Sequence, residues 1–486
     1  MRFKMPPKWR AVLMGAASAW LAFSASHSIS ARAQSGAPTS DTETQAIKPA
    51  AIRPLDAVDP DPFRLAVRDA VYAHPNVRGA LAERARVKQT RREALAGLLP
   101  TLSVGLAGQQ QISSSFDDAP ADLIVESARP RRRVDVSVDG EQLIFDSGAT
   151  FARMDAADER IDEAAAQTLV EAGTVALRAV RAYLEVAQFN RLKAVGAALV
   201  DRHNAILSQV SLRYDNGVGS VQDVARVEAR KATAIAQLAG FDRGFAAAQS
   251  RFQQLFREVS ETAVLRPALL AGAAITESDK LALALAVNPA MRQAQARAKA
   301  ADFDYKAVRR GNLPSVSVAV NATRFGVFQD RNDFDVRGRL VMDYDLFAGG
   351  ARKARERQSF QQARQAAFQS DQIRLEVERD TRIAVRDLAV LTTQIETLQS
   401  ALLANRNARD AFTEQFAVAR GSLLDLLQAE ADFFAAEIAL INGTMERDIA
   451  HYRLLVQTGE VFDVFGIDFS FALGDEAHMR NTQGAP

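Results

Sequence analysis

The chain contains the same change of pattern twice, each time at a proline. The stretch GLLPTLSVGL around Pro100 returns as GNLPSVSVAV around Pro314, 214 residues further on, and Pro75 and Pro289 are separated by the same interval. In each copy a segment rich in Ala, Arg, Glu and Leu ends at the proline, which lacks an amide and clashes with the preceding helical turn. The chain must therefore contain two copies of one helix-to-strand unit, and the first helix is expected from Phe63 to Leu99.

After each proline, apolar and polar side chains alternate with a period of two. This pattern predicts two strand hairpins, over about 100–145 and about 314–347. A soluble sandwich would alternate in the same way. Here, however, the polar positions include Asp and Arg, which suits a transmembrane barrel with lipid outside and water inside. We expect three apolar side chains to face lipid and two serines to face the lumen: Val136, Val318 and Leu340, and Ser137 and Ser317.

Four strands cannot close a barrel in lipid, because transmembrane barrels start near eight strands and open edges are not tolerated there. The chain must therefore associate with copies of itself. Three copies would supply twelve strands and a lumen wide enough for water. Strand count alone does not distinguish a trimer from a dimer, which would also close.

Each hairpin leads into a run without proline, from Ala149 to Arg213 and from Ala351 to Arg420. A helix of 65 residues would be roughly 98 Å long, far beyond a typical globular helix. Aliphatic side chains step by three and four along both runs, at Leu192, Val195 and Leu199, and at Leu388, Leu391, Ile395, Leu398 and Leu402. This spacing predicts coiled-coil packing.

A second pair of motifs follows the long helices at an offset of 202 residues. NGVGSVQDVARVEA aligns with VARGSLLDLLQAEA, which pairs Gly219 with Gly421, Ser220 with Ser422 and Asp223 with Asp425. We expect the glycine to end one helix and the serine to cap the next one. Each half therefore reads as helix, hairpin, long helix, tight turn and returning helix.

The N-terminus predicts export from the cytoplasm. Arg2, Lys4, Lys8 and Arg10 precede the apolar run AVLMGAASAWLAF, and Ala31-Arg32-Ala33 matches a signal-peptidase site. We therefore expect a cleaved signal peptide over residues 1–33. No later run of 18 apolar residues is present, so no transmembrane helix is expected.

Composition and motifs argue against an enzyme. The chain has a net charge of +1 and no cysteine, so neither a nucleic-acid partner nor a thiolate site is indicated. HExxH, Walker-type GxxxxGK[ST] and GxSxG motifs are all missing from the sequence. We therefore expect no catalytic residues, no metal and no cofactor.

Three paired features recur in the two halves of the chain: the strands that start at a proline, the turns LIFDSG and DLFAGG, and the motifs GSVQDV and GSLLDLLQAEADFFAAEIAL. On these features, residues from about 63 to 466 resemble the TolC family of outer-membrane channel proteins. The resemblance implies a mainly α fold with a transmembrane part: a trimeric twelve-stranded β-barrel joined to an α-helical coiled-coil tunnel in the periplasm. The closing segment AHYRLLVQTGEVFDVFGI looks most like members that serve type I secretion.

The resemblance also implies a gate at the helix tips. It assigns Asp425 to a ring of acidic side chains, one from each subunit, around the closed entrance. Family members commonly have a second acidic residue one turn later, where this chain has Gln428. Asp223 matches an acidic position in the first tip that can link neighbouring helices.

These observations predict six segments: a signal peptide (1–33), a leader (34–62), a first repeat (63–258, with its long helix at about 149–213), a linker (259–278), a second repeat (279–466, with its long helix at about 351–420) and a C-terminal tail (467–486). The expected protein is a homotrimer in the Gram-negative outer membrane, in contact with its lipid. The resemblance implies two further partners, a periplasmic adaptor and an inner-membrane transporter of ABC type.

The expected function is a passive conduit for type I protein secretion, with multidrug efflux as the alternative. A periplasmic or surface coiled-coil structural protein is the second alternative, in which the strands would form a soluble domain. A detergent-requiring oligomer in the outer-membrane fraction would support the conduit, and a freely soluble chain would support the structural protein.

Overall fold

The computed structural model describes residues 58–113, 130–256, 264–272, 276–329 and 333–469. The predicted signal peptide, nearly all of the predicted leader, and most of the predicted C-terminal tail lie outside these residues. The first repeat comprises α1 (Asp61–Ala73), α2 (Pro75–Ala96), β1 (Thr101–Gln110), β2 (Arg132–Phe145), α4 (Ala149–Asp215) and α5 (Val221–Leu255). The second comprises α6 (Glu277–Val287), α7 (Pro289–Arg310), β3 (Ser315–Arg324), β4 (Phe334–Asp343), α8 (Ala351–Ala417) and α9 (Leu423–Gln457), and is followed by α10 (Val461–Phe465).

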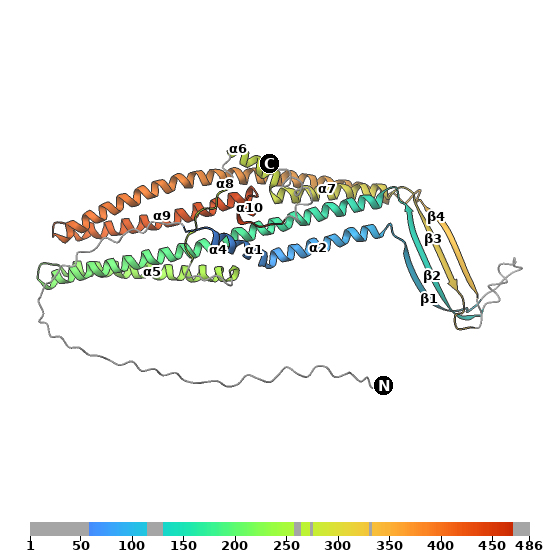
Figure 1. Cartoon of the computed structure of the whole chain (residues 1–486), viewed down its shortest axis with the longest axis horizontal. Helices are drawn as coiled ribbons and strands as arrows, with labels where there is room; N and C mark the ends of the chain where they lie inside the picture. Colours follow the sequence, from blue (N-terminus) through green and yellow to red (C-terminus); the bar gives the residue numbers. More distant parts are fainter. Residues whose placement is uncertain (1–57, 114–129, 257–263, 273–275, 330–332, 470–486) are drawn as a thin grey trace, which may run out of the picture. The chain divides into compact units, whose positions relative to one another are not determined.

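The duplication extends to the lengths of the elements (Figure 1). Helices α2 and α7 have 22 residues each, α4 and α8 have 67 each, and α5 and α9 have 35 each. The two long helices therefore match the proline-free runs in the sequence. No helix in the described part of the chain is both long and apolar enough to cross a membrane.

The expected single helix from Phe63 to Leu99 is wrong, because it breaks at His74. The backbone of His74 is extended, with ψ of 132°, since Pro75 disfavours a helical conformation in the residue before it. Nδ1 of His74 then accepts the amide of Asn76 at 3.1 Å and caps α2. In the second repeat, Oδ1 of Asn288 caps α7 in the same way, accepting the amide of Ala290 at 2.9 Å.

The four strands form one antiparallel sheet in the order β1-β2-β3-β4. Its register sorts the side chains onto two faces. One face carries almost only apolar side chains: Leu102, Val104, Leu106, Val134, Val136, Val138, Val316, Val318, Val320, Val336, Leu340 and Met342. The other carries polar and charged ones, including Asp135, Ser137, Asp139, Glu141, Asn321, Asp335, Arg337 and Arg339. The predicted alternation is confirmed, with Gln142 and Arg324 as polar side chains on the apolar face.

Ser317 lies on the polar face of the sheet as expected, but its side chain is buried. It is only 8% exposed, because it lies between Leu143 of β2 and Val341 of β4 in the register. The alternating pattern predicts on which face of the sheet a residue lies. It does not predict how exposed the residue is, because that depends on which side chains lie beside it on the neighbouring strands.

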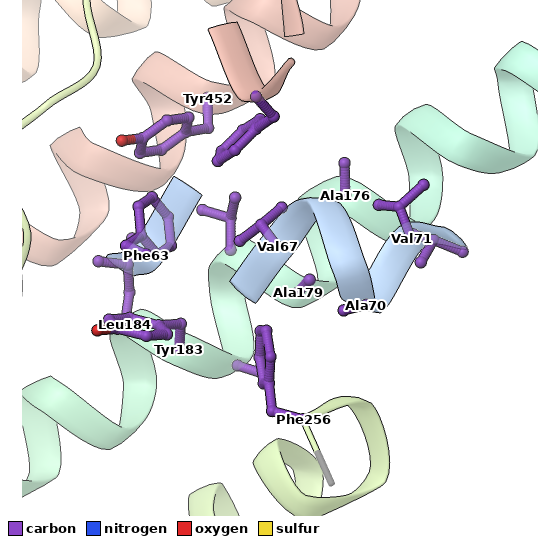
Figure 2. Packing of buried hydrophobic residues seen from close by; sticks show 14 of the residues in the cluster. Phe63, Val67, Ala70, Val71, Ala176, Ala179, Tyr183, Leu184, Phe256 and Tyr452 are labelled. Carbon is purple, nitrogen blue, oxygen red and sulfur yellow. The ribbon is translucent and has the colours of Figure 1, made fainter. Parts of the chain in front are cut away.

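The largest hydrophobic cluster joins both repeats (Figure 2). Phe63 of α1 is fully buried, and its ring centroid lies 4.7 Å from Tyr183 of α4 and 5.7 Å from Tyr452 of α9. Helix α10 joins the same cluster through Phe465, whose ring centroid lies 5.6 Å from that of Phe63. Burial raises the pKa of Tyr452 to about 12, and its hydroxyl accepts the amide of Leu270 at 3.3 Å.

The predicted leucine stripes pack between helices. Leu192, Val195 and Leu199 of α4 are buried in a cluster with Phe434 of α9. Ile395 and Leu402 of α8 are buried with Phe433 and Leu440, also of α9. Helix α4 thus buries the predicted stripe, whereas α8 buries Ile395 and Leu402 and leaves Leu388, Leu391 and Leu398 half-buried.

Candidate functional site: the helix tips and their seam

The first tip is the turn between α4 and α5. The amide of Gly217 donates to the carbonyl of Tyr214 at 2.9 Å, and that of Val218 donates to the carbonyl of Arg213 at 3.0 Å. These two hydrogen bonds end the helix, and the residue between them in the left-handed conformation is Gly217, with φ of 74°. Oγ of Ser220 then accepts the amide of Gln222 at 3.1 Å and starts α5.

The second tip repeats this geometry with one costly difference. The amides of Ala419 and Arg420 donate to the carbonyls of Phe416 and Gln415 at 3.2 and 2.9 Å, and Oγ of Ser422 caps α9 by accepting the amide of Leu424 at 3.1 Å. The left-handed residue is here Ala419, with φ of 57°. A Cβ in this conformation approaches the following carbonyl, so the second tip is strained where the first is not.

We predict that Ala419→Gly stabilises the protein by about 1 kcal/mol and that Gly217→Ala destabilises it by a similar amount, because only glycine adopts this conformation without cost. Thermal unfolding of the two variants in the same detergent tests the pair. A stabilising effect of both substitutions, or of neither, would contradict the left-handed assignment.

The expected role of Gly219 and Gly421 as helix ends is wrong, because the left-handed residues lie two positions earlier. The two glycines are needed for close packing instead. A Cβ at Gly219 would lie 2.8 Å from the backbone nitrogen of Tyr214, and one at Gly421 would lie 3.0 Å from that of Phe416. The predicted serine caps, by contrast, are present at both tips.

The two tips pack against each other. Ile206 and Val210 of α4, Val227 of α5, Phe416 of α8, and Leu423, Leu426 and Leu427 of α9 form one buried cluster. Arg213 adds a polar link between the tips. Its Nη2 donates to the backbone carbonyl of Phe416 at 2.6 Å, and its guanidinium lies 4.2 Å from the centroid of the Phe416 ring. The end of α4 thus holds the end of α8.

The predicted gate residues lie near these turns, where Asp425 and Gln428 are exposed and Asp223 is half-buried. Asp425 lies in the first turn of α9, and Gln428 follows one turn later on the same exposed face. Asp223 lies in the first turn of α5, where its carboxylate is 3.8 Å from Arg226 of the same helix. Among the described residues, no ion pair links Asp223 to a neighbouring helix.

The sequence reasoning missed Asp432. Nε2 of Gln428 donates to Oδ1 of Asp432 at 2.9 Å. Asp425, Gln428 and Asp432 are spaced by three and four residues, so they line one exposed face of α9. That spacing was available in the sequence and could have identified the second carboxylate.

A row of arginines on α4 forms the seam to the second helical hairpin, and the sequence reasoning missed it as well. Arg191, Arg202 and Arg213 are 11 residues apart, which is close to three helical turns. Nη2 of Arg191 donates to Glu437 at 3.2 Å, and Nε of Arg202 donates to Glu430 at 2.7 Å. The side chain of Glu430 is 3% exposed and that of Arg202 is 11% exposed, so the second pair is buried.

A cavity of about 130 Å³ lies along this seam, and Arg191, Arg202, Glu430 and Glu437 contribute to its wall. Arg409 of α8 completes its charged lining. This arginine is 3% exposed, lies 4.1 Å from the centroid of Phe433, and pairs with Asp410 at 2.6 Å. Burial raises the pKa of Glu437, and Arg191 and Arg409 oppose that rise. The seam thus brings together charged side chains of both signs, with Glu430 and Arg409 the most deeply buried of them.

No group of His, Asp and Glu in the part of the chain that the structure describes could hold a metal ion. The arrangement consists of helix ends, a polar seam between the helical hairpins and a two-faced sheet.

Comparison with known proteins places this arrangement. The family model described as outer membrane efflux protein matches residues 281–460. The chain is 26% identical over 330 residues to the outer membrane efflux protein BepC of Brucella suis biovar 1 (strain 1330), which covers 67% of this chain and 72% of that protein.

Two solved structures have the same fold. The outer membrane protein VceC of Vibrio cholerae matches with a TM-score of 0.71 at 17% identity, over 81% of this chain and 95% of that one. The MtrE outer membrane channel of Neisseria gonorrhoeae, in its open state, matches with a TM-score of 0.70 at 16% identity, over 88% of this chain and 97% of that one.

The fold is therefore that of an outer-membrane channel protein. The comparisons confirm the predicted resemblance to the TolC family. The names of these relatives describe outer-membrane, channel and efflux proteins, and none of them describes an enzyme.

Proposed function

We propose that the chain is the outer-membrane conduit of a tripartite export system and that it works as a homotrimer. The observation that carries this proposal is the sheet: Leu102, Val104 and Leu106 on β1 are 75%, 72% and 72% exposed on its apolar face. Such a face needs lipid, and a sheet with two open edges needs further strands to exist in lipid. Three copies supply twelve strands, with the charged faces lining a water-filled lumen.

The helical hairpins extend this conduit toward the inner membrane. Helices of 67 residues can each reach roughly 100 Å, which suits a tunnel through the periplasm. Their tips are then the entrance, where a periplasmic adaptor and an inner-membrane transporter would dock. The signal peptide expected at residues 1–33 would supply the export step.

We propose type I protein secretion as the cargo class, served by an ABC-type transporter, on the likeness of the closing segment from Ala450 to Ile467. Small-molecule efflux is the second candidate, favoured by the name of the relative BepC. Deletion of the gene tests both. Loss of a secreted protein with unchanged drug tolerance supports secretion, and drug sensitivity with an unchanged set of secreted proteins supports efflux. An unchanged phenotype together with a freely soluble protein would contradict the conduit.

At the entrance, three-fold assembly would bring three Asp425 carboxylates around one axis. The resting channel should conduct little, because the closed tips form a constriction. It should prefer cations, because a ring of negative charge attracts them. The adaptor would open it by drawing the tips apart. Arg213 and the buried pair of Arg202 with Glu430 then act as the links that hold the two hairpins of one subunit together.

We predict that Asp425→Ala weakens cation preference and divalent-cation block severalfold while leaving the yield of assembled protein unchanged, because this exposed side chain adds little to helix packing. Single-channel recordings in planar bilayers provide the measurement. Gln428→Ala and Asp432→Asn are the matched variants on the same face. Unchanged selectivity in Asp425→Ala would remove this residue from the gate, and a larger effect in either matched variant would place the constriction further along α9.

A further inference from the structure

The turn between β4 and α8 presents apolar side chains to the surroundings. Leu346 and Phe347 in this turn are 87% and 88% exposed. Tyr344, which is 49% exposed, continues the period of two from Met342 on the apolar face of the sheet. The apolar surface of the sheet therefore extends past the last residue of β4 and up to the start of α8.

The start of α8 is unusually basic for a helix N-terminus. The sequence ARKARER places Arg352, Lys353, Arg355 and Arg357 in its first two turns, against the single acidic residue Glu356. Positive charges at a helix N-terminus oppose the helix dipole. Arg352 and Lys353 lie in the first turn, where the dipole acts, so two of these four charges stand against the local preference.

Among the described residues, Arg352 is the one of these four side chains that forms an ion pair: it donates to the carboxylate of Asp345 at 2.5 Å. Arg355 is exposed and lines a groove that residues of α2, α4 and α7 also line. Lys353 and Arg357 are exposed and lie four residues apart on one helix face, where like charges repel. Neither takes part in an ion pair among the described residues. This pair therefore presents a positive surface without an internal counter-charge.

The first repeat shows that a helix can start here without this basic pair. At the offset of 202 residues, Lys353 and Arg357 correspond to Phe151 and Asp155 at the start of α4. Phe151 is 58% exposed, so the apolar character of the junction is shared by both repeats and the basic pair is not.

Resting on the proposed function, we propose that this junction binds the anionic headgroups of phospholipids in the inner leaflet of the outer membrane. Leu346 and Phe347 enter the edge of the hydrocarbon layer, as apolar and aromatic side chains do at membrane interfaces. Lys353 and Arg357, one to two helical turns further from the sheet, then reach the level of the phosphates with their long side chains. Two observations favour an anionic phospholipid here: the apolar turn continues the apolar face of the sheet, and the positive charges of Lys353 and Arg357 complement a negatively charged headgroup.

The test uses the full protein, extracted in detergent and transferred to nanodiscs of phosphatidylethanolamine alone or mixed with phosphatidylglycerol. The readouts are the phosphatidylglycerol retained on re-extraction, measured by mass spectrometry, and the thermal midpoint. Each basic side chain near an anionic membrane surface raises the binding constant by about a factor of five. Because K353Q/R357Q removes two such side chains, it should retain at least about tenfold less phosphatidylglycerol than the wild type. The wild type should also gain a higher thermal midpoint from that lipid, and the variant should not.

Two control variants make the result specific. Arg243→Gln on the exposed surface of α5 removes a charge far along the chain and should retain the lipid as the wild type does. K353R/R357K keeps both charges and should do so as well. Equal retention by the wild type and K353Q/R357Q would overturn the proposal. A smaller oligomer for K353Q/R357Q in detergent would also overturn it, because the surface would then be a contact between subunits.

Failure of this inference is distinguishable from failure of the proposed function. Wild-type protein that is absent from the outer-membrane fraction would contradict the conduit itself. Protein found in that fraction, but without preference for phosphatidylglycerol, would contradict only the headgroup site.

Discussion

Leu340→Arg and Val318→Arg should each lower the stability of the membrane-inserted protein by about 2–4 kcal/mol and reduce the amount of assembled oligomer, because each would place a charge against hydrocarbon near the midplane. The two side chains are direct partners across β3 and β4 on the apolar face, and Leu340 is 74% exposed in the single chain. Quantifying the heat-resistant oligomer in the outer-membrane fraction provides the measurement.

The matched control is Ser103→Arg on the opposite face. Ser103 is exposed and lies directly across from Asp139 in the register, so the new guanidinium would face water beside a carboxylate. Ser317 is less suitable, because its burial would add a steric effect. If arginine at Ser103 and at Leu340 reduced the oligomer equally, the assignment of the two faces to lumen and lipid would be wrong.

The second large effect is expected at the seam. Glu430→Ala should destabilise the protein by about 3–5 kcal/mol, because it leaves the buried guanidinium of Arg202 without its carboxylate partner. Their 2.7 Å contact connects α4 to α9, and both side chains are largely shielded from water. Chemical denaturation of the detergent-solubilised protein, followed by its helical signal, measures the loss.

Two comparisons isolate the charge effect. The double variant Arg202→Met with Glu430→Met should recover most of the stability, since it removes both buried charges and keeps their volume. Glu185→Ala should cost less than about 1 kcal/mol, because its partner Arg251 is half exposed. A double variant as unstable as Glu430→Ala would show that packing, and not the unpaired charge, accounts for the loss.

Several parts of the fold were predictable because each depends on a local physical rule. Proline breaks a helix at any position beyond its first turn, so Pro100 and Pro314 mark the change from helix to strand. The break at His74 followed from the same rule applied to the residue before Pro75, and could have been predicted. The serine caps were predictable too, because a cap involves a side chain and an amide only two residues apart.

The site was predictable only in part. Ser220 and Ser422 were assigned correctly, whereas Gly219 and Gly421 were given the wrong role, since both a left-handed turn and a close backbone contact favour glycine. The left-handed conformation of Ala419 could not be predicted from the sequence, because prediction relies on the preference of glycine for this conformation and alanine rarely adopts it. The gate roles of Asp425, Gln428 and Asp223 stay predictions for the channel recordings.

By itself, the sequence determined the repeated order of elements, their approximate ends and the two-faced character of the strands, because chain stiffness, helix breaking and side-chain period act between near neighbours. Only the tertiary structure decided which helices meet. The contacts of Arg202 with Glu430 and of Arg213 with Phe416 join residues 228 and 203 positions apart. Many arginines and glutamates along these helices could have paired, and the choice depends on how far each helix is rotated and shifted against its neighbours. Those two quantities arise from the packing of whole helix faces, which a local pattern does not contain.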